Sequence, residues 1–397
     1  MNFLRYYFYY IFLHLTLTGS SFVQIGDAVS VHVDSSASYK HISNILKAKT
    51  DEISDGVYVL TPGAVLNFGK PGTPLDLSLS AKYDIYQYQD YENLDINLMK
   101  VYLNGSYNPS EIFNSNFSYS NLEGQSAKSE FSVDNDDLSL VETTTESVSL
   151  STTYRYSPKL SLSLGLKQSE LNYDSAEDKE RLSSKKSTNI PFKFIYQYSN
   201  KLNVLYGVTF SNNEVGEKQS DNLPAYETDS VYYNLGLNGT ILPKLTGNLD
   251  IGYRTLSFSD STNDFTAFGA TSSLTWNTLP KLRTSIKLSR DFDSAGNGGT
   301  FRSTVANINA LYSISTDYKL SASFGRTLKF FRDNAIRSIE SRHETLTNFS
   351  LNLHYYPSSN YSFSAGYTFI KSDSDDDNKR IAIYDAKEFR LSANLKY

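Results

Sequence analysis

The chain of 397 residues contains no cysteine, 31 tyrosines and 23 phenylalanines, and its formal charge at pH 7 is −6. No apolar run beyond residue 20 approaches the roughly 18 residues of a spanning helix, which excludes a membrane protein built from helices. The lack of cysteine excludes disulfide scaffolds and thiolate metal sites, the acidic charge argues against a nucleic-acid partner, and the aromatic content of 14% argues against disorder.

The first segment has the pattern of a secretory signal. Arg5 precedes an apolar, aromatic stretch at residues 6–17, and small residues follow at 19–21 and again at 26–28. About 12 apolar residues are too few to span a bilayer, which disfavours a membrane anchor. We therefore predict a signal peptide within residues 1–28, cleaved between about residues 21 and 28, and a mature region at 29–397.

From residue 29 on, apolar and polar residues alternate with a period of two. Side chains on a strand point alternately to opposite faces, so each segment has one apolar and one polar face. Clear examples are Val148, Leu150, Thr152 and Tyr154; Leu160, Leu162, Leu164 and Leu166; Val231, Tyr233, Leu235 and Leu237; and Phe349, Leu351, Leu353 and Tyr355.

Short and long links alternate between these predicted strands. Turn residues (Pro, Asn, Ser) mark short links at 70–73, 108–111, 157–159, 199–201, 242–244, 279–281, 316–319 and 357–360. Longer polar links lie at 123–145, 174–188, 212–229, 292–300, 332–344 and 371–386, with lesser ones at 87–93 and 259–264. The predicted strands of about 11–14 residues exceed the usual 5–6 and are long enough for the 9–11 residues of a tilted membrane strand.

This organisation favours a membrane barrel over a soluble β-sandwich, which would have shorter strands and no systematic division of its links. We predict an all-β, transmembrane antiparallel meander barrel. Eight short turns define sixteen strands between residues 56 and 370, and residues 387–397 add one. Short turns are periplasmic, so the strand that starts at residue 56 and ends at the first short turn must start at the outer side. The mature N-terminus starts in the periplasm, so one more strand must cross the membrane before residue 56. Residues 29–39 supply that strand, with residues 41–55 as the first outer loop. The total is about 18 strands, with 16 as the alternative.

One segment resembles a known family. Residues 36–69 read SASYKHISNILKAKTDEISDGVYVLTPGAVLNFG, which is similar to the N-terminal signature of the putative β-barrel porins of the second type, from Gram-negative outer membranes. Asp55, Tyr58, Pro62 and Gly63 occupy the expected positions, whereas residues 40–42 separate Tyr39 from Ser43 more than the pattern does. Beyond this segment, only alternation and length match.

The last residues resemble the signal that the barrel-assembly machinery reads. That signal has a terminal aromatic residue and apolar residues at alternate positions. The candidates are Phe389, Leu391, Leu395 and Tyr397.

The polar faces predict a lumen with more cations than anions. The inward cations are Lys82, Arg155, Lys167, Lys193, Arg254, Arg283, Lys287, Arg390 and Lys396, and the inward anions are Asp76, Asp84, Asp250 and Glu388. Charges that line a pore tune ion selectivity, so we expect a weak anion preference. The alternative is that these charges pair with neighbours and leave little net field.

No catalytic or cofactor site is predicted. Asp373, Asp375 and Asp377 are weak candidates for Ca²⁺, but the glycine and distal glutamate of a complete Ca²⁺ loop are missing, which favours a solvated loop. The histidines at 32, 41, 343 and 354 have no nucleophile and acid at a recognisable spacing, so we expect no enzyme.

The sequence thus favours an outer-membrane, porin-like channel for passive passage of small hydrophilic solutes. The family resemblance implies an alternative, a barrel partner of a periplasmic polysaccharide-export protein in capsule or exopolysaccharide export. A third possibility is a structural or adhesive barrel without an open pore. Expected partners are outer-membrane lipid, lipopolysaccharide and the assembly machinery.

Overall fold

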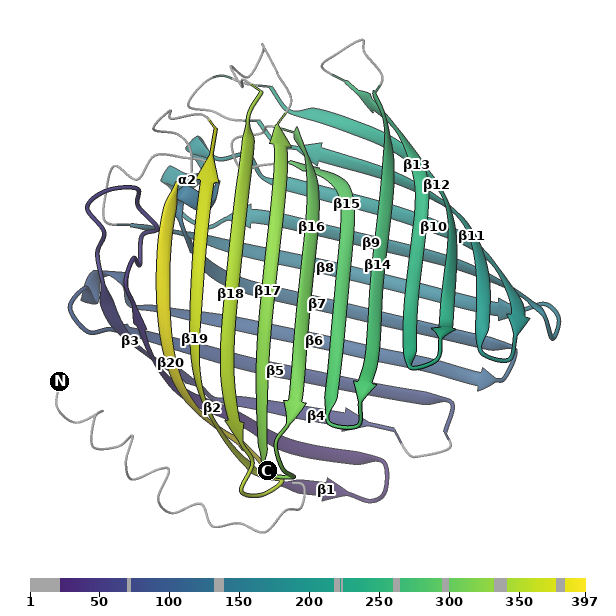
Figure 1. Ribbon diagram of the computed structural model, residues 1–397, viewed down its shortest axis with the longest axis horizontal. Helices are drawn as coiled ribbons and strands as arrows, with labels where there is room; N and C mark the ends of the chain where they lie inside the picture. Colours follow the sequence, from purple (N-terminus) through teal and green to yellow (C-terminus); the bar gives the residue numbers. More distant parts are fainter. Residues whose placement is uncertain are drawn as a thin grey trace.

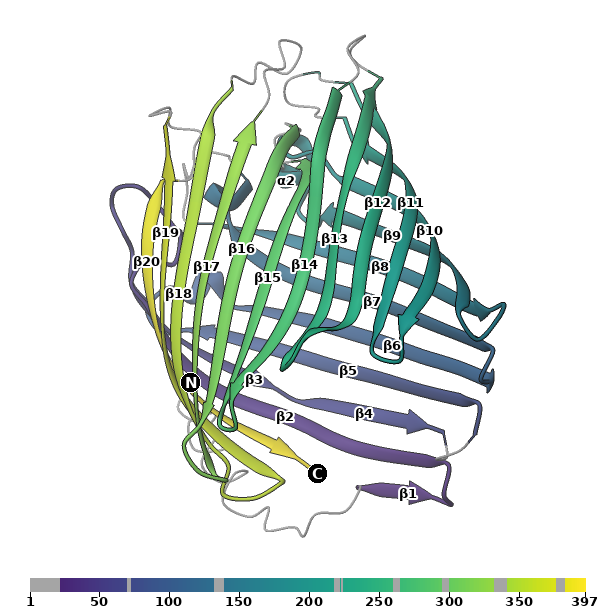
Figure 2. The same cartoon turned by 45° about the vertical axis from the view of Figure 1, so that its right-hand side comes forward.

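Each strand pairs with the next in sequence, and the last pairs with the first, which closes the sheet into an antiparallel barrel of 18 spanning strands (Figures 1 and 2). The computed structural model describes residues 22–69, 73–131, 139–217, 222, 224–259, 265–294, 300–331, 341–375 and 383–397. Closure joins β2 to β20 from Asp34↔Lys396 to Ile42↔Glu388. The fold class and strand number agree with the sequence prediction.

The strands share the length and pairing expected of a meander. They are β2 (Val29–Ile42), β3 (Asp55–Thr61), β4 (Gly63–Phe68), β5 (Leu75–Tyr88), β6 (Ile96–Ser110), β7 (Phe113–Ala127), β8 (Leu140–Arg155), β9 (Leu160–Tyr173), β10 (Lys185–Ser199), β11 (Leu202–Val215), β12 (Tyr226–Leu242), β13 (Leu245–Phe258), β14 (Phe265–Leu279), β15 (Leu282–Ser294), β16 (Thr300–Ser313), β17 (Tyr318–Phe331), β18 (His343–Tyr355), β19 (Tyr361–Ser374) and β20 (Tyr384–Lys396).

One spanning strand is interrupted by a proline. β3 and β4 continue in one register along β2, because Thr61 faces Ser36 and Ala64 faces Val33. Pro62 between them has no N–H to donate to the ladder, so the sheet pairing lapses there. The two pieces therefore count as one barrel strand.

The seam between the first and last strands is lengthened at its lower end. A short strand, β1 (Val23–Ile25), pairs with β2 from Val23↔Val31 to Ile25↔Val29. Tyr397 exchanges backbone hydrogen bonds with Val33 at 2.6 and 2.8 Å, and its ring centroid lies 6.1 Å from that of Phe22. Residues 1–21, on which most of the predicted signal falls, lie outside the described residues.

The two ends of the barrel differ, as the link lengths predict. In Figure 1, short turns lie along the lower and right-hand edges, with the C-terminus at the bottom, and long links lie along the top and the left. Short turns are periplasmic in outer-membrane barrels, so the end with long links is called the outer end below. The long links hold η1 (Glu92–Leu94), η2 (Lys128–Phe131) and α2 (Ala176–Arg181). No helix among the described residues is long and apolar enough to cross a membrane.

The uninterrupted spanning strands are longer than the 11–14 residues read from the sequence. They range from 13 residues in β15 to 17 in β12. The difference lies in the long links: Glu123↔Thr144 and Ala127↔Leu140 are ladder pairs inside the predicted loop 123–145. Backbone pairing continues above the bilayer, where both faces carry polar residues and the alternation that marks a strand is lost.

Candidate functional site: the lumen and its outer mouth

The barrel wall separates an apolar outer face from a polar inner face. Ile308, Phe324 and Phe349 stand side by side on neighbouring strands, and each keeps 41–46% of its surface exposed toward the lipid side. The residues between them, such as Asn307, Gly325 and Asn348, point to the lumen. Side-chain direction in the wall is thus set by the ladder register.

The same register places the predicted pore charges on the inner face. It does so for Lys82, Asp84, Arg155, Lys167, Lys193, Asp250, Arg254, Arg283, Lys287 and Arg390. It also adds five cations and five anions in the described strands: Lys40, Lys100, Lys185, Lys319 and Lys329, with Asp34, Asp55, Asp291, Asp293 and Glu344. Lys185, Asp293 and Glu344 escaped detection because they lie in strand extensions that read as loops.

Part of this charge is compensated by ion pairs. Lys82 Nζ lies 2.7 Å from Asp34 Oδ2, and Arg390 Nε lies 3.2 Å from Glu388 Oε1. Asp84 is buried and accepts from Lys100 Nζ at 2.5 Å and from the Thr61 hydroxyl at 2.6 Å. Asp250 accepts instead from neutral amides, from Asn234 at 2.9 Å and Asn248 at 3.3 Å.

Six of the nine predicted inward cations have no carboxylate partner among the described residues; one is Lys396 at the periplasmic end of β20, and the other five lie in the barrel wall. They are Arg155, Lys167, Lys193, Arg283 and Lys287, on β8, β9, β10 and β15. Their charged groups line these sectors of the inner wall.

Arg254 of β13 lies near the outer end and connects its strand to β12 and β15, while the Tyr232 ring beneath it covers β13 and β14. Its guanidinium stacks on the Tyr232 ring at 4.9 Å and donates to Asp291 Oδ2 at 3.0 Å. The Tyr232 ring lies over Gly252 and Gly269, where an added Cβ would approach it to 2.8 Å. Glycine is therefore required at both positions for the ring to cover the sheet.

Links from distant parts of the chain meet at the outer mouth. Lys47, from the β2–β3 link, pairs with Glu130 of η2, and its ammonium lies 5.8 Å from the centre of the Tyr384 ring. Lys128 of the same turn is buried and lies 3.8 Å from Glu177 of α2. These contacts place links from three sectors of the rim against one another.

Apolar side chains also gather at this end. The described buried clusters lie there, and they include Val215, Tyr226, Leu256 and Phe258; Ile45, Leu46 and Leu94; Val141, Tyr173 and Leu182; Phe301 and Phe331; and Tyr384 and Ala386. A wall with a wet lumen has no core at mid-height, so its buried apolar contacts concentrate where strand ends and links close together.

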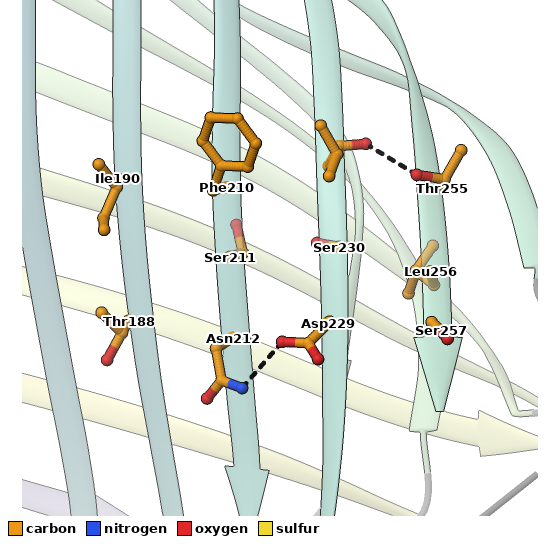
Figure 3. A pocket seen from close by; sticks show the side chains of 11 residues that line it. Thr188, Ile190, Phe210, Ser211, Asn212, Asp229, Ser230, Thr255, Leu256 and Ser257 are labelled. Atoms are coloured by element: carbon orange, nitrogen blue, oxygen red, sulfur yellow. Dashed lines mark hydrogen bonds between the residues drawn. The ribbon is translucent and has the colours of Figure 1, made fainter. Parts of the chain in front are cut away.

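A surface groove lies on the lipid side of β10–β13 (Figure 3). Ile190, Phe210 and Val231 form its apolar part, and Asn212 donates to Asp229 at 2.9 Å in its polar part. It is a depression between outward side chains and does not reach the lumen charges.

Two of the acidic loop candidates contact basic side chains. Lys371 Nζ lies 3.1 Å from Asp373 Oδ2. The backbone N–H and ring Nδ1 of His343 both lie 2.7 Å from Asp375, and these hydrogen bonds lower the pKa of the Asp375 carboxyl below its usual range. Asp377 lies outside the described residues. Within the described chain, no three His, Asp or Glu side chains converge as a metal site.

The family model for putative beta-barrel porin 2 matches residues 44–397. The chain belongs to this family. It is accordingly an outer-membrane β-barrel, as the sequence resemblance implies.

The residues of the family signature stabilise the seam and the mouth. Asn44 is fully buried; its amide donates to the Ala48 carbonyl at 2.9 Å and to the carbonyl of Asp385 in β20 at 3.0 Å. Ser43 N–H donates to the Lys387 carbonyl at 2.9 Å, and Lys387 N–H donates to the Ser43 hydroxyl at 2.9 Å. The signature therefore extends barrel closure beyond the last ladder pair.

One solved structure shows the β-barrel fold at low identity. The FrpB iron transporter from Neisseria meningitidis in its apoprotein form is 10% identical, with a TM-score of 0.51, and the match covers 94% of this chain and 82% of that one. OpdL from Pseudomonas aeruginosa is 12% identical, with a TM-score of 0.46 and coverages of 93% and 98%.

Another FrpB variant structure is 12% identical, with a TM-score of 0.47, and the match covers 86% of this chain but only 62% of that chain. No curated protein matches the sequence.

Proposed function

We propose that this barrel is a passive channel for small hydrophilic solutes with a weak preference for anions. The observation that carries the proposal is the set of five lumen cations without a described carboxylate partner: Arg155, Lys167, Lys193, Arg283 and Lys287. A positive wall potential raises the local anion concentration and lowers that of cations. Transport along a gradient requires no catalytic group.

The test is the reversal potential of the refolded protein in a planar bilayer under a KCl gradient. A wall potential on the order of half a kT per unit charge predicts that chloride permeates about threefold faster than potassium, because the anion is enriched and the cation depleted by the same factor. Replacing Lys193 and Lys287 with glutamate should move the reversal potential toward cation selectivity. Lys186→Gln is the matched control, because Lys186 points to lipid and lies 3.5 Å from Glu214. Clear cation selectivity of the unaltered protein would reject the proposal.

A second candidate is a conduit for polysaccharide export. Its support is the aromatic residues on the inner wall: Tyr86 and Tyr102 share the inward face with Asp84 and Lys100, and Lys40 Nζ lies 5.3 Å from the centre of the Tyr86 ring. Aromatic faces beside hydrogen-bonding groups suit sugar rings. If micromolar acidic oligosaccharide blocks the current through the refolded protein in a planar bilayer, that result favours polysaccharide export. If the barrel is folded but shows no conductance, that result favours a structural role.

We also propose that the protein itself is secreted across the inner membrane by a signal peptide that is then cleaved. Cleavage near residue 21 would retain β1, and cleavage after residue 28 would remove it. The N-terminal sequence of the protein recovered from outer membranes distinguishes the two.

A further inference from the structure

Three arginines point outward, toward lipid, on three consecutive strands at the outer end. They are Arg290 on β15, Arg302 on β16 and Arg326 on β17. The register gives their direction: Arg290 faces Thr304 and Arg326 faces Ala306, in the same alternating set as the exposed Ile308 and Phe324.

The ladder also fixes their spacing. Arg302 is one strand and two residues from Arg290, and Arg326 is two strands and two residues from Arg290 in the opposite direction. With strands about 4.8 Å apart and a rise of about 3.4 Å per residue, the Cα atoms of Arg302 and Arg326 lie roughly 8 and 12 Å from that of Arg290 and roughly 14 Å from each other. Three arginine side chains can reach a common point over these distances.

None of the three has an anionic partner among the described residues. The described ion pairs include no Arg290, Arg302 or Arg326, and Arg290 Nε is buried without an acceptor. Arg302 instead stacks its guanidinium on the outward Phe330 ring at 5.2 Å. Outward acids elsewhere in the described wall include Glu146, Glu170, Glu214 and Asp229 on β8, β9, β11 and β12, and Asp373 on β19, whose carboxylate lies 3.1 Å from Lys371 Nζ.

Arg326 lies within the apolar band. On the same face of β17 it is flanked by Phe324 and Leu328, which are 46% and 43% exposed. An arginine on the lipid face destabilises a barrel most at mid-bilayer and much less near the interface. Extension of the side chain toward an interfacial anion reduces that destabilisation, as does a hydrogen-bonded partner there.

We propose that Arg290, Arg302 and Arg326 form a binding site for the phosphate groups of an anionic glycolipid in the outer leaflet. The planar guanidinium matches two phosphate oxygens at once, and three such groups suit a headgroup that carries two phosphates. The Phe324, Phe330 and Leu328 side chains provide apolar surface for the acyl chains beside it.

The test measures binding of bis-phosphorylated lipid A to the refolded full-length protein in detergent by native mass spectrometry. We expect binding of this lipid and at least tenfold weaker binding of fully dephosphorylated lipid A. Charge-assisted hydrogen bonds predict roughly a tenfold loss for Arg326→Gln alone and a larger loss for the triple glutamine variant.

Lys186→Gln is the control, because it removes an outward cation from another sector, and it should leave binding unchanged. Heat-modifiable migration on gels verifies that each variant is folded; if the triple variant misfolds, the three single variants are compared. Equal binding of the dephosphorylated lipid, an equal loss in Lys186→Gln, or displacement of the lipid by low millimolar inorganic phosphate would each overturn the proposal. The last result would indicate a site for soluble anions.

Discussion

At the scale of single residues, the outer mouth depends on buried polar side chains. Asp55, in the family signature, is 2% exposed, and its carboxylate accepts N–H groups from Gly56 at 2.6 Å and from Asp90 and Tyr91 at 3.2 Å. It therefore joins the start of β3 to the β5–β6 link. The sequence marked Asp55 through its family resemblance, but its partners 35 and 36 residues away could not be identified from the motif.

Asp55→Asn should destabilise the folded barrel. The amide retains at most one accepting oxygen for three backbone donors, and hydrogen bonds to a charged group are worth about 1.5–3 kcal/mol. We expect a lower free energy of unfolding in urea titrations followed by tryptophan fluorescence. Glu52→Gln is the control, because Glu52 is an exposed carboxylate in the β2–β3 link, close to Asp55 in the sequence. Equal stability of Asp55→Asn and the unaltered protein would contradict this role.

At the scale of elements, β14 and β15 are held together differently at their two ends. Their ladder runs from Leu279↔Leu282 to Ala270↔Arg290, whereas β13 and β14 continue to Leu256↔Phe265. The two strands diverge toward the outer end in Figure 1. The Arg254–Asp291 ion pair crosses from β13 to β15 just beyond the last ladder pair. A side-chain contact thus extends the sheet where the ladder ends.

Removing one partner of this ion pair should lower the free energy of unfolding more than replacing both partners. The Arg254 side chain is 12% exposed, so Asp291→Asn leaves a largely buried cation without its carboxylate. We expect Asp291→Asn to lower unfolding free energy by about 1–3 kcal/mol and Arg254→Met/Asp291→Asn to recover part of that loss. The measurement is a double-mutant cycle in urea; strictly additive effects would show that the pair is not coupled.

At the scale of the whole molecule, one strand pair joins the two ends of the barrel sequence. β20 completes the circle on β2, and its outward residues include Phe389 and Leu391, both 46% exposed, with Leu395 and the terminal Tyr397. Their proposed recognition by the assembly machinery requires an apolar, alternating face that is available before closure.

Replacing Phe389 and Tyr397 with serine should reduce the heat-modifiable protein in outer membranes severalfold. The substitution removes two aromatic side chains from the outward apolar face of β20, which the assembly machinery is proposed to recognise, and leaves its inward face unchanged. Tyr397→Phe should assemble normally, and Ser392→Ala is the control, because Ser392 is inward on the same strand. Normal assembly of the double serine variant would exclude this signal.

The sequence by itself determined the fold class and the direction of most wall residues, and it favoured 18 strands over 16, which the closed sheet confirms. A period of two assigns every second side chain to one face, and link length distinguishes the two barrel ends. Lys193 and Lys287 were identifiable as lumen residues for this reason, because both lie in long alternating segments.

Only the tertiary structure decided which charges are compensated and what closes the mouth. Lys82 pairs with Asp34, 48 residues away, and Asn44 bonds to Asp385, 341 residues away. Such contacts depend on ladder register and barrel closure, which alternation within one segment does not specify. The register decides whether a cation faces the lumen or the lipid, and the described contacts decide whether it has a carboxylate partner. Both of our proposals, the channel and the lipid site, rest on these two properties.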